Sequence, residues 1–357
     1  MKNKVKLFLI VALALGFVSC GPEELAYLLQ QAPGQLYLLM NRVPIKKVLE
    51  RQDLDPEVRA KLELALDVKQ YSEEKLGLVH NQSYTIYREL DRDALTYNLT
   101  ACPEFSIEPL RWQFPVVGEM PYLGFFKQED VQKKETELEA KGYDVYVRVA
   151  NAYSMLGIVA DPLYTPMLKW SEYELVNTII HELAHGTVWA KGYPEFNENL
   201  ALFIGNQGAV NYCTDKWGPD SEQLKYGTGS NQDDYTFYLY INTLADELRA
   251  LYARTEISDD ERLKLKQEVF EKTKKDFAES WMPRMKTQDY ARWPKIELNN
   301  ATVAGRLVYY HDLSLYQKVY EKNGSDLEKM IGFLQEVIAE NPGDPEKYLL
   351  EWIKSKN

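Results

Sequence analysis

The stretch Thr178-Ile179-Ile180-His181-Glu182-Leu183-Ala184-His185 decides how the rest of the chain is interpreted. Residues four apart lie on one face of an α-helix, so His181 and His185 can each present an imidazole nitrogen to one metal ion. Glu182, beside the first histidine, can then act as a general base on water. The chain has only four histidines in 357 residues. The stretch predicts a zinc-dependent hydrolytic site, and a core helix with two hydrogen-bonded histidines is the competing interpretation.

The residues around this stretch predict the limits of its helix. Ser171, followed three residues later by Glu174, forms a capping box typical of a helix start. Gly192 and Pro194 predict that the helix ends at about residue 191. Asn177 shares the face of the histidines at a spacing of four. It can therefore hydrogen-bond a ligand histidine, or it occupies an exposed helix position.

A second helical pattern begins after a short turn and offers a third ligand. Helices joined by a short turn pack antiparallel, which brings the first turn of the second helix back beside His185. Glu198 is therefore the predicted third zinc ligand, and the fourth position is left for water. Glu195 is its competitor, although it lies in the turn. Asn197 can serve as a helix cap.

The N-terminus predicts export and a lipid anchor. A basic start, an apolar run over residues 7–18 and the small residues up to Cys20 indicate a lipoprotein signal peptide over residues 1–20. The apolar run is shorter than the roughly 20 residues that a membrane span needs. We expect a lipid on Cys20 to hold the protein in the bacterial cell envelope, facing the periplasm or the exterior. An ordinary cleaved signal is the alternative.

Composition and patterning predict the fold class. The net charge of -12 argues against a nucleic-acid partner, because phosphate binding requires a basic surface. No repeat or long linker divides the chain, so we expect one domain over 21–357, α+β and predominantly helical. Its expected parts are a helical scaffold over 21–80, a strand-rich part over 83–170, zinc-site helices over 171–215 and a helical part over 235–357. A small mixed sheet is expected beside the motif helix, with extra helices at both ends.

Of four further features, three leave alternatives open. Alternating residues on both sides of Asp91-Arg92-Asp93 predict two short strands around a turn. Residues 143–149 predict a strand. The stretch 144–153 either pairs with an extended substrate at a sheet edge or belongs to an interior strand of a small sheet. The polar, glycine-bearing stretch 217–234 predicts a long loop, either a lid or a surface excursion. Cys102 and Cys213 either form a disulfide or are buried single thiols.

The C-terminal part contains candidate oxyanion donors. A zinc peptidase needs a hydrogen-bond donor aimed at the oxyanion of the tetrahedral intermediate. His311 is the only histidine after the motif, and Tyr310 is the alternative donor. Because the chain has 25 tyrosines, most of which are expected in the core, a core role for Tyr310 is the competing interpretation.

The motif helix and the segment Asn197-Glu198-x-x-Ala201 together resemble the gluzincin pattern, in which a glutamate of the next helix is the third ligand. More specifically, the chain resembles a family of bacterial lipoproteins described as predicted aminopeptidases. The resemblance covers nearly all of the mature chain. Beyond the two helices, it is carried by Gly34-Gln35-Leu36, Leu76-Gly77-Leu78, Ser83-Tyr84, Phe114-Pro115-Val116-Val117-Gly118, Pro121-Tyr122-x-Gly124, Ala152-Tyr153-Ser154-x-Leu156-Gly157 and Asn299-Asn300-Ala301.

This resemblance implies a zincin-like metallopeptidase that binds one zinc ion, acts on peptides and is an aminopeptidase. The chain departs from better-known gluzincins in its shorter gap between His185 and Glu198. It also has Leu202 where some of them keep an aspartate that orients a ligand histidine. A zinc endopeptidase is one alternative, because no acidic group for a free amine can be assigned. A non-catalytic surface lipoprotein with a structural metal site is another, although such a site needs no base like Glu182.

Overall fold

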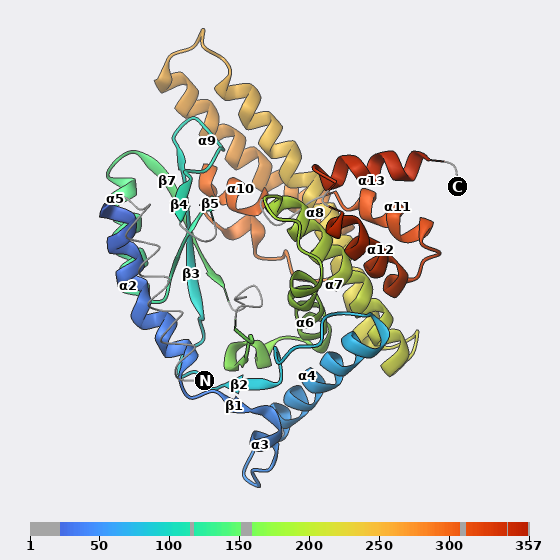
Figure 1. Cartoon of the computed structure of the whole chain (residues 1–357). Helices are drawn as coiled ribbons and strands as arrows, with labels where there is room; N and C mark the ends of the chain where they lie inside the picture. Colours follow the sequence, from blue (N-terminus) through green and yellow to red (C-terminus); the bar gives the residue numbers. More distant parts are fainter. Residues whose placement is uncertain (1–21, 115–117, 151–158, 308–311, 341, 356–357) are drawn as a thin grey trace.

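The structure is a computed structural model that describes residues 22–114, 118–150, 159–307, 312–340 and 342–355 (Figure 1). The predicted signal peptide with Cys20 lies outside the described residues. The described part is α+β and predominantly helical, as expected, with three small sheets. In this part, no helix is long and apolar enough to span a membrane. The α-helices are α2 Pro22–Leu39, α3 Ile45–Leu49, α4 Pro56–Lys75, α5 Gln128–Glu139, α6 Glu172–Thr187, α7 Pro194–Trp217, α8 Glu222–Tyr252, α9 Asp259–Asp276, α10 Asn300–Leu307, α11 Ser314–Lys322, α12 Leu327–Ala339 and α13 Pro345–Lys354.

The strands form three separate sheets. They are β1 Val43–Pro44, β2 Ile86–Arg88, β3 Thr96–Pro103, β4 Trp112–Phe114, β5 Gly118–Met120, β6 Leu123–Phe125, β7 Tyr143–Ala150 and β8 Leu163–Tyr164. The sheet β1-β2-β8 is mixed, the sheet β6-β3-β7 is antiparallel, and β4 pairs with β5 alone. Strands therefore flank the predicted turn at Asp91-Arg92-Asp93, but β2 and β3 belong to different sheets and form no hairpin. Local alternation identifies such strands and does not identify their partners.

Strand β7 lies at the edge of its sheet within the described part of the chain, which argues against the interior alternative. Helix α10 packs on β3 and β7, and the residues at its start fix the edge strand. The Asn299 side chain donates to the Val145 carbonyl at 2.8 Å, and the Asn300 backbone donates to Asp144 at 2.8 Å. Asn300, which is fully buried, also donates to the Pro103 carbonyl at 3.0 Å. The shared Asn-Asn-Ala segment thus has a structural role here.

Helices α6 and α7 lie in the middle of the molecule, between the sheet β6-β3-β7 and the C-terminal helices (Figure 1). Their apolar faces belong to the largest core cluster, which includes α4 and parts of α11, α12 and α13. The two helices approach closely at Gly205, where a Cβ atom would lie 3.1 Å from the side chains of Asn177 and His181. This close approach holds the motif helix against α7.

The stretch 217–234, predicted as a loop or lid, is mostly helical: after a short turn, α8 begins at Glu222. Ser221 caps it by accepting a hydrogen bond from the Leu224 backbone at 3.4 Å. Its glycines are contact positions, because a Cβ at Gly227 would lie 2.1 Å from the Tyr173 ring. The prediction was wrong because glycine also permits close helix packing, which a local pattern does not distinguish from a turn.

Both remaining cysteines are free and buried, so the disulfide alternative is not supported. Cys102 lies with Ala301 and Ala304 beneath α10, whereas Cys213 belongs to the main core cluster. Burial raises the pKa of the Cys213 thiol to about 12 and that of Cys102 higher still. They behave as small apolar core residues.

Candidate metal centre and adjoining cleft

The capping box that starts α6 is present as predicted. The Ser171 hydroxyl accepts from the Glu174 backbone at 3.2 Å, and the Ser171 backbone donates to the Glu174 carboxylate at 2.8 Å. The helix ends earlier than expected, at Thr187, with Val188 in an extended conformation. The Thr187 hydroxyl accepts a hydrogen bond from the Val79 backbone at 2.9 Å, and this long-range contact coincides with the helix end.

The side chain of Asn197, which we predicted to be a helix cap, holds the segment between α6 and α7. Asn197 accepts from the Ala190 backbone N–H at 2.8 Å and donates to the Ala190 carbonyl at 2.9 Å. Tyr193 occupies the N-cap position of α7 instead. Asn197 therefore fixes the turn, so that the first turn of α7, with Glu198, returns beside α6.

His181, His185 and Glu198 converge, and their ligand atoms all lie within 4.8 Å of one another. The two Nε2 atoms are 3.2 Å apart. The Glu198 carboxylate oxygens lie 3.8 Å from His181 Nε2 and 3.6 Å from His185 Nε2. Its competitor Glu195 is exposed at the start of α7 and is not part of this group.

The donor set fits a zinc ion. Two nitrogens bound at 2.0–2.1 Å with a tetrahedral angle are separated by roughly 3.3 Å, close to the observed spacing of 3.2 Å. Burial lowers the pKa of His181 to about 3, with a further contribution from His185. Burial also lowers the pKa of His185 to about 4. Both rings are therefore neutral near pH 7, which is the form that binds metal.

The partners of the two rings differ. The His181 ring also makes a hydrogen bond to the backbone of Ala201, which fixes the orientation of the ring. This bond takes the part that an aspartate plays in some gluzincins at the position of Leu202. The His185 ring packs edge-on against Trp189, with 5.8 Å between centroids, and its buried Nδ1 has no hydrogen-bond partner among the described residues. The Asn177 side chain donates to the Asn206 side chain of α7 at 2.7 Å. Its amide group therefore links the two helices, whereas the sequence had offered it as a partner of a ligand histidine.

Glu182 follows His181 on α6 and has one carboxylate oxygen buried. Tyr84 is buried, has a left-handed φ of 60°, and lies close enough to Glu182 to feel the charge of its carboxylate. Burial raises the pKa of Tyr84 well above its usual range, and the Glu182 charge raises it further. The predicted oxyanion donors Tyr310 and His311 lie outside the described residues.

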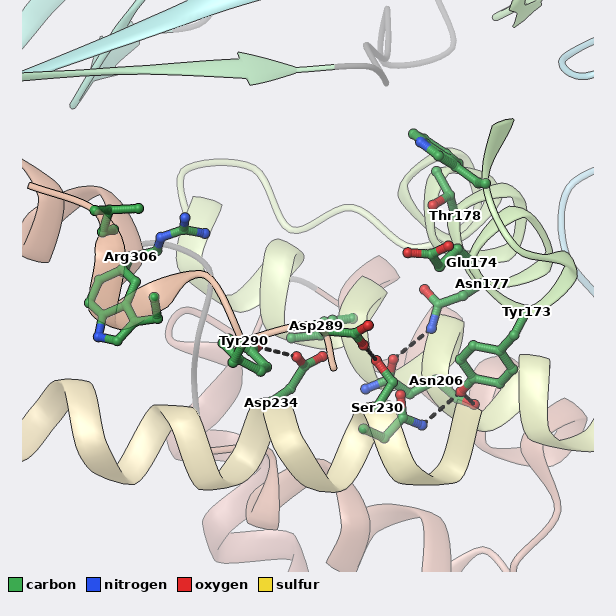
Figure 2. Close-up of a pocket in the computed structure, with 15 residues that line it drawn as sticks. Tyr173, Glu174, Asn177, Thr178, Asn206, Ser230, Asp234, Asp289, Tyr290 and Arg306 are labelled. Atoms are coloured by element: carbon green, nitrogen blue, oxygen red, sulfur yellow. Dashed lines mark hydrogen bonds between the residues drawn. The ribbon is translucent and has the colours of Figure 1, made fainter. Parts of the chain in front are cut away.

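A cleft of about 420 Å³ that was not predicted lies along the first half of α6, on residues that precede His181 in the helix (Figure 2). Its walls come from α6, α7, α8, the segment around residues 289–296 and α10. Charged and aromatic side chains line it, among them Tyr173, Glu174, Asp234, Asp289, Trp293 and Arg306. No spacing rule connects residues so far apart in the chain, so the sequence carried no signal for the cleft.

A family model described as "Putative aminopeptidase" matches residues 26–348. No curated protein and no solved structure is significantly similar to the chain.

Proposed function

Since the chain belongs to this putative aminopeptidase family, we propose that it is a zinc-dependent peptidase held at the surface of a bacterial membrane by a lipid on Cys20. The family description supports peptide hydrolysis. The signal-like N-terminus supports an envelope location facing away from the cytosol.

One observation carries the zinc assignment. His181, His185 and Glu198 bring three ligand atoms to one point from two packed helices. Catalytic zinc sites use three protein ligands of this kind and keep one position open. Closed structural sites use four ligands, and the sequence neighbour of His181 is a carboxylate, Glu182, which a purely structural site does not need.

The residues of the chain then have distinct roles. His181, His185 and Glu198 would hold the zinc ion, which would supply a Lewis acid that lowers the pKa of water and polarises the peptide carbonyl. Glu182 removes the proton from the attacking water and passes it to the leaving amine. Tyr310 or His311 stabilises the oxyanion, as the sequence predicts.

Strand β7 is the candidate for binding the substrate backbone. The Val145 carbonyl points away from β3, toward Asn299, and residues two apart on a strand point to the same edge. Val147 and Val149 therefore present their backbone groups on the outer edge of β7. An extended peptide can add to that edge as a further strand.

The decisive experiment compares three Glu→Gln variants for zinc content and peptide hydrolysis. Glu182→Gln keeps the side-chain shape but removes the base, so we expect one bound zinc and a loss of at least about 100-fold in kcat. Glu198→Gln should lose zinc. Glu195→Gln is the matched control on the same helix turn and should keep both zinc and activity. Full activity in Glu182→Gln, or equal zinc loss in both α7 variants, would disprove the assignment.

Exopeptidase and endopeptidase activity are separated by two substrates. A free aminoacyl anilide tests for an aminopeptidase, as the family description suggests. An internally quenched peptide with a blocked N-terminus tests for an endopeptidase. A zinc-loaded protein that cleaves neither substrate, nor mixed peptides, would support a structural metal site instead.

A further inference from the structure

The cleft continues the metal centre along the same helix faces. The α6 residues that line it lie three, four, seven and eight positions before His181, so they share its face. The α7 residues that line it lie four and eight positions after Glu198 and share the face of that ligand. These residues are Tyr173, Glu174, Asn177 and Thr178 on α6, with Leu202 and Asn206 on α7. A peptide bound at the metal centre can therefore extend into the cleft.

Carboxylates dominate the charge of the cleft. Asp234 accepts a hydrogen bond from the Tyr290 hydroxyl, and Asp289 accepts one from the Ser230 hydroxyl at 3.0 Å. Within the described part of the chain, no Lys or Arg forms an ion pair with Asp234, Asp289 or Glu174. Burial, and then the neighbouring charge of Asp289, raise the pKa of Asp234 to about 6. Among the described residues, the negative charge of Asp234 and Asp289 is thus not paired with a side-chain cation.

Arg306, the cationic residue of the lining, lies at one end of the cleft. Figure 2 shows Asp234 and Asp289 close together, with Arg306 at one end and Glu174 at the other. Arg306 donates to the Tyr146 hydroxyl at 3.2 Å and lies over the Trp293 ring, 5.5 Å from its centroid. It therefore belongs to the wall next to β7 and does not neutralise the carboxylates.

The distance between the scissile bond and the carboxylates of the cleft decides which cation of a peptide can reach them. The amine of the residue whose bond is cleaved lies about 2.5 Å from the scissile carbonyl carbon. Glu174 lies seven residues before His181, about 10 Å away along the α6 axis. Its carboxylate turns further away, because it accepts from Ser171 at the helix start. The long apolar stem of Lys or Arg can span such a distance along the aromatic walls.

We propose that this cleft is a specificity subsite that binds a cationic group of the substrate, namely the side chain of a Lys or Arg residue near the scissile bond. The inference rests on the proposed peptidase function and names its substrate class, basic peptides. An N-terminal ammonium further along the peptide has the same chemistry and is the other source of charge to be tested.

The test uses pairs of quenched fluorescent peptides that differ only in Arg or the neutral, similarly shaped citrulline. The pair is placed at each position around the cleaved bond, with the N-terminus free or acetylated. For the zinc-loaded wild-type protein, we expect kcat/KM to be about 10-fold or more higher for the Arg peptide at one position. In the double variant Asp234→Asn/Asp289→Asn the ratio of the two kcat/KM values should fall to nearly one, mainly through a higher KM for the Arg peptide. Asp220→Asn, which removes an exposed carboxylate away from the cleft, is the matched control and should keep the ratio.

Failure of this inference can be distinguished from failure of the proposed function. Cleavage of both peptides by the wild type without preference overturns the inference alone, and so does a preference that the double variant retains. If kcat/KM depends on whether the N-terminus is free or acetylated, and not on Arg against citrulline, the bound cation is the terminal ammonium and the side-chain assignment is wrong. If no peptide is cleaved, the proposed function fails. Calorimetric binding of the same peptides to zinc-loaded Glu182→Gln then decides the inference: tighter binding of Arg supports it, and equal binding overturns it.

Discussion

Replacing Asp234 by Asn is expected to stabilise the protein at high pH and not at low pH. Burial is the main cause that raises the pKa of the Asp234 carboxyl from 3.8 to about 6, with Asp289 adding to it against the Tyr290 hydrogen bond. Because the folded-state pKa is above the unfolded value, the folded state binds the proton more tightly. The ionised carboxylate therefore destabilises the fold, and this cost grows as the pH rises from about 4 to above 6.

The structure sets the size of the effect. A difference of one pH unit in pKa corresponds to about 1.36 kcal/mol, so the interval from 3.8 to about 6 gives a ceiling of about 3 kcal/mol at pH 8. Asn keeps an oxygen that accepts from Tyr290, although a neutral acceptor is weaker, and we expect a gain of about 1–2 kcal/mol. At pH 4 most of this gain should be absent.

The assay is urea denaturation of the wild type and the variant at pH 4 and pH 8. The difference between the two proteins at each pH removes contributions that they share, such as proton competition for zinc. Asp220→Asn controls for the change in net charge and should shift the midpoint little at either pH. A gain in Asp234→Asn that is equal at both pH values would refute the electrostatic reasoning, and so would a loss of stability at pH 8.

Two further predictions concern helix packing and the metal. Gly227→Ala should lower the free energy of unfolding by about 1–2 kcal/mol, because a Cβ 2.1 Å from the Tyr173 ring outweighs the roughly 1 kcal/mol that alanine gains in a helix. Gly332→Ala in α12, where a Cβ meets nothing within 4 Å, should instead stabilise the protein; urea midpoints that shift in the same direction would contradict this. Removal of zinc by a chelator should lower the melting temperature, and zinc at about 100 times its Kd should restore about 2.7 kcal/mol. His185→Ala should show no such dependence.

Local signals in the sequence were sufficient for the centre of the fold. The capping box at Ser171 depends on two residues three apart, and it lies at the start of α6. The short turn before α7 requires the second helix to return, and Glu198 consequently lies beside His181 and His185. Such features are predictable because the interacting residues are close in sequence or joined by a short connection.

Long-range contacts account for what the sequence did not show. Gly227 resembles a loop residue until Tyr173, 54 positions earlier, is known to lie against it. The end of α6 at Thr187 coincides with a hydrogen bond to Val79, and the pairing of β2 with β8 joins residues more than 70 positions apart. In each case a contact between distant segments overrides the local pattern.

If the proposed function is correct, the acidic cleft narrows the kind of peptide bond that the protein is expected to cleave. An aminopeptidase that removes single residues needs its amine-binding carboxylate within a few ångströms of the scissile carbonyl, whereas the Glu174 backbone lies about two helix turns from His181. The negative charge of Asp234 and Asp289 is expected to cost stability, and a cation supplied by the substrate would remove that cost on binding. If the Arg and citrulline peptides differ as expected, the selectivity of the proposed peptidase lies in a side-chain subsite, and any clamp for a free amine has to be sought closer to Glu182.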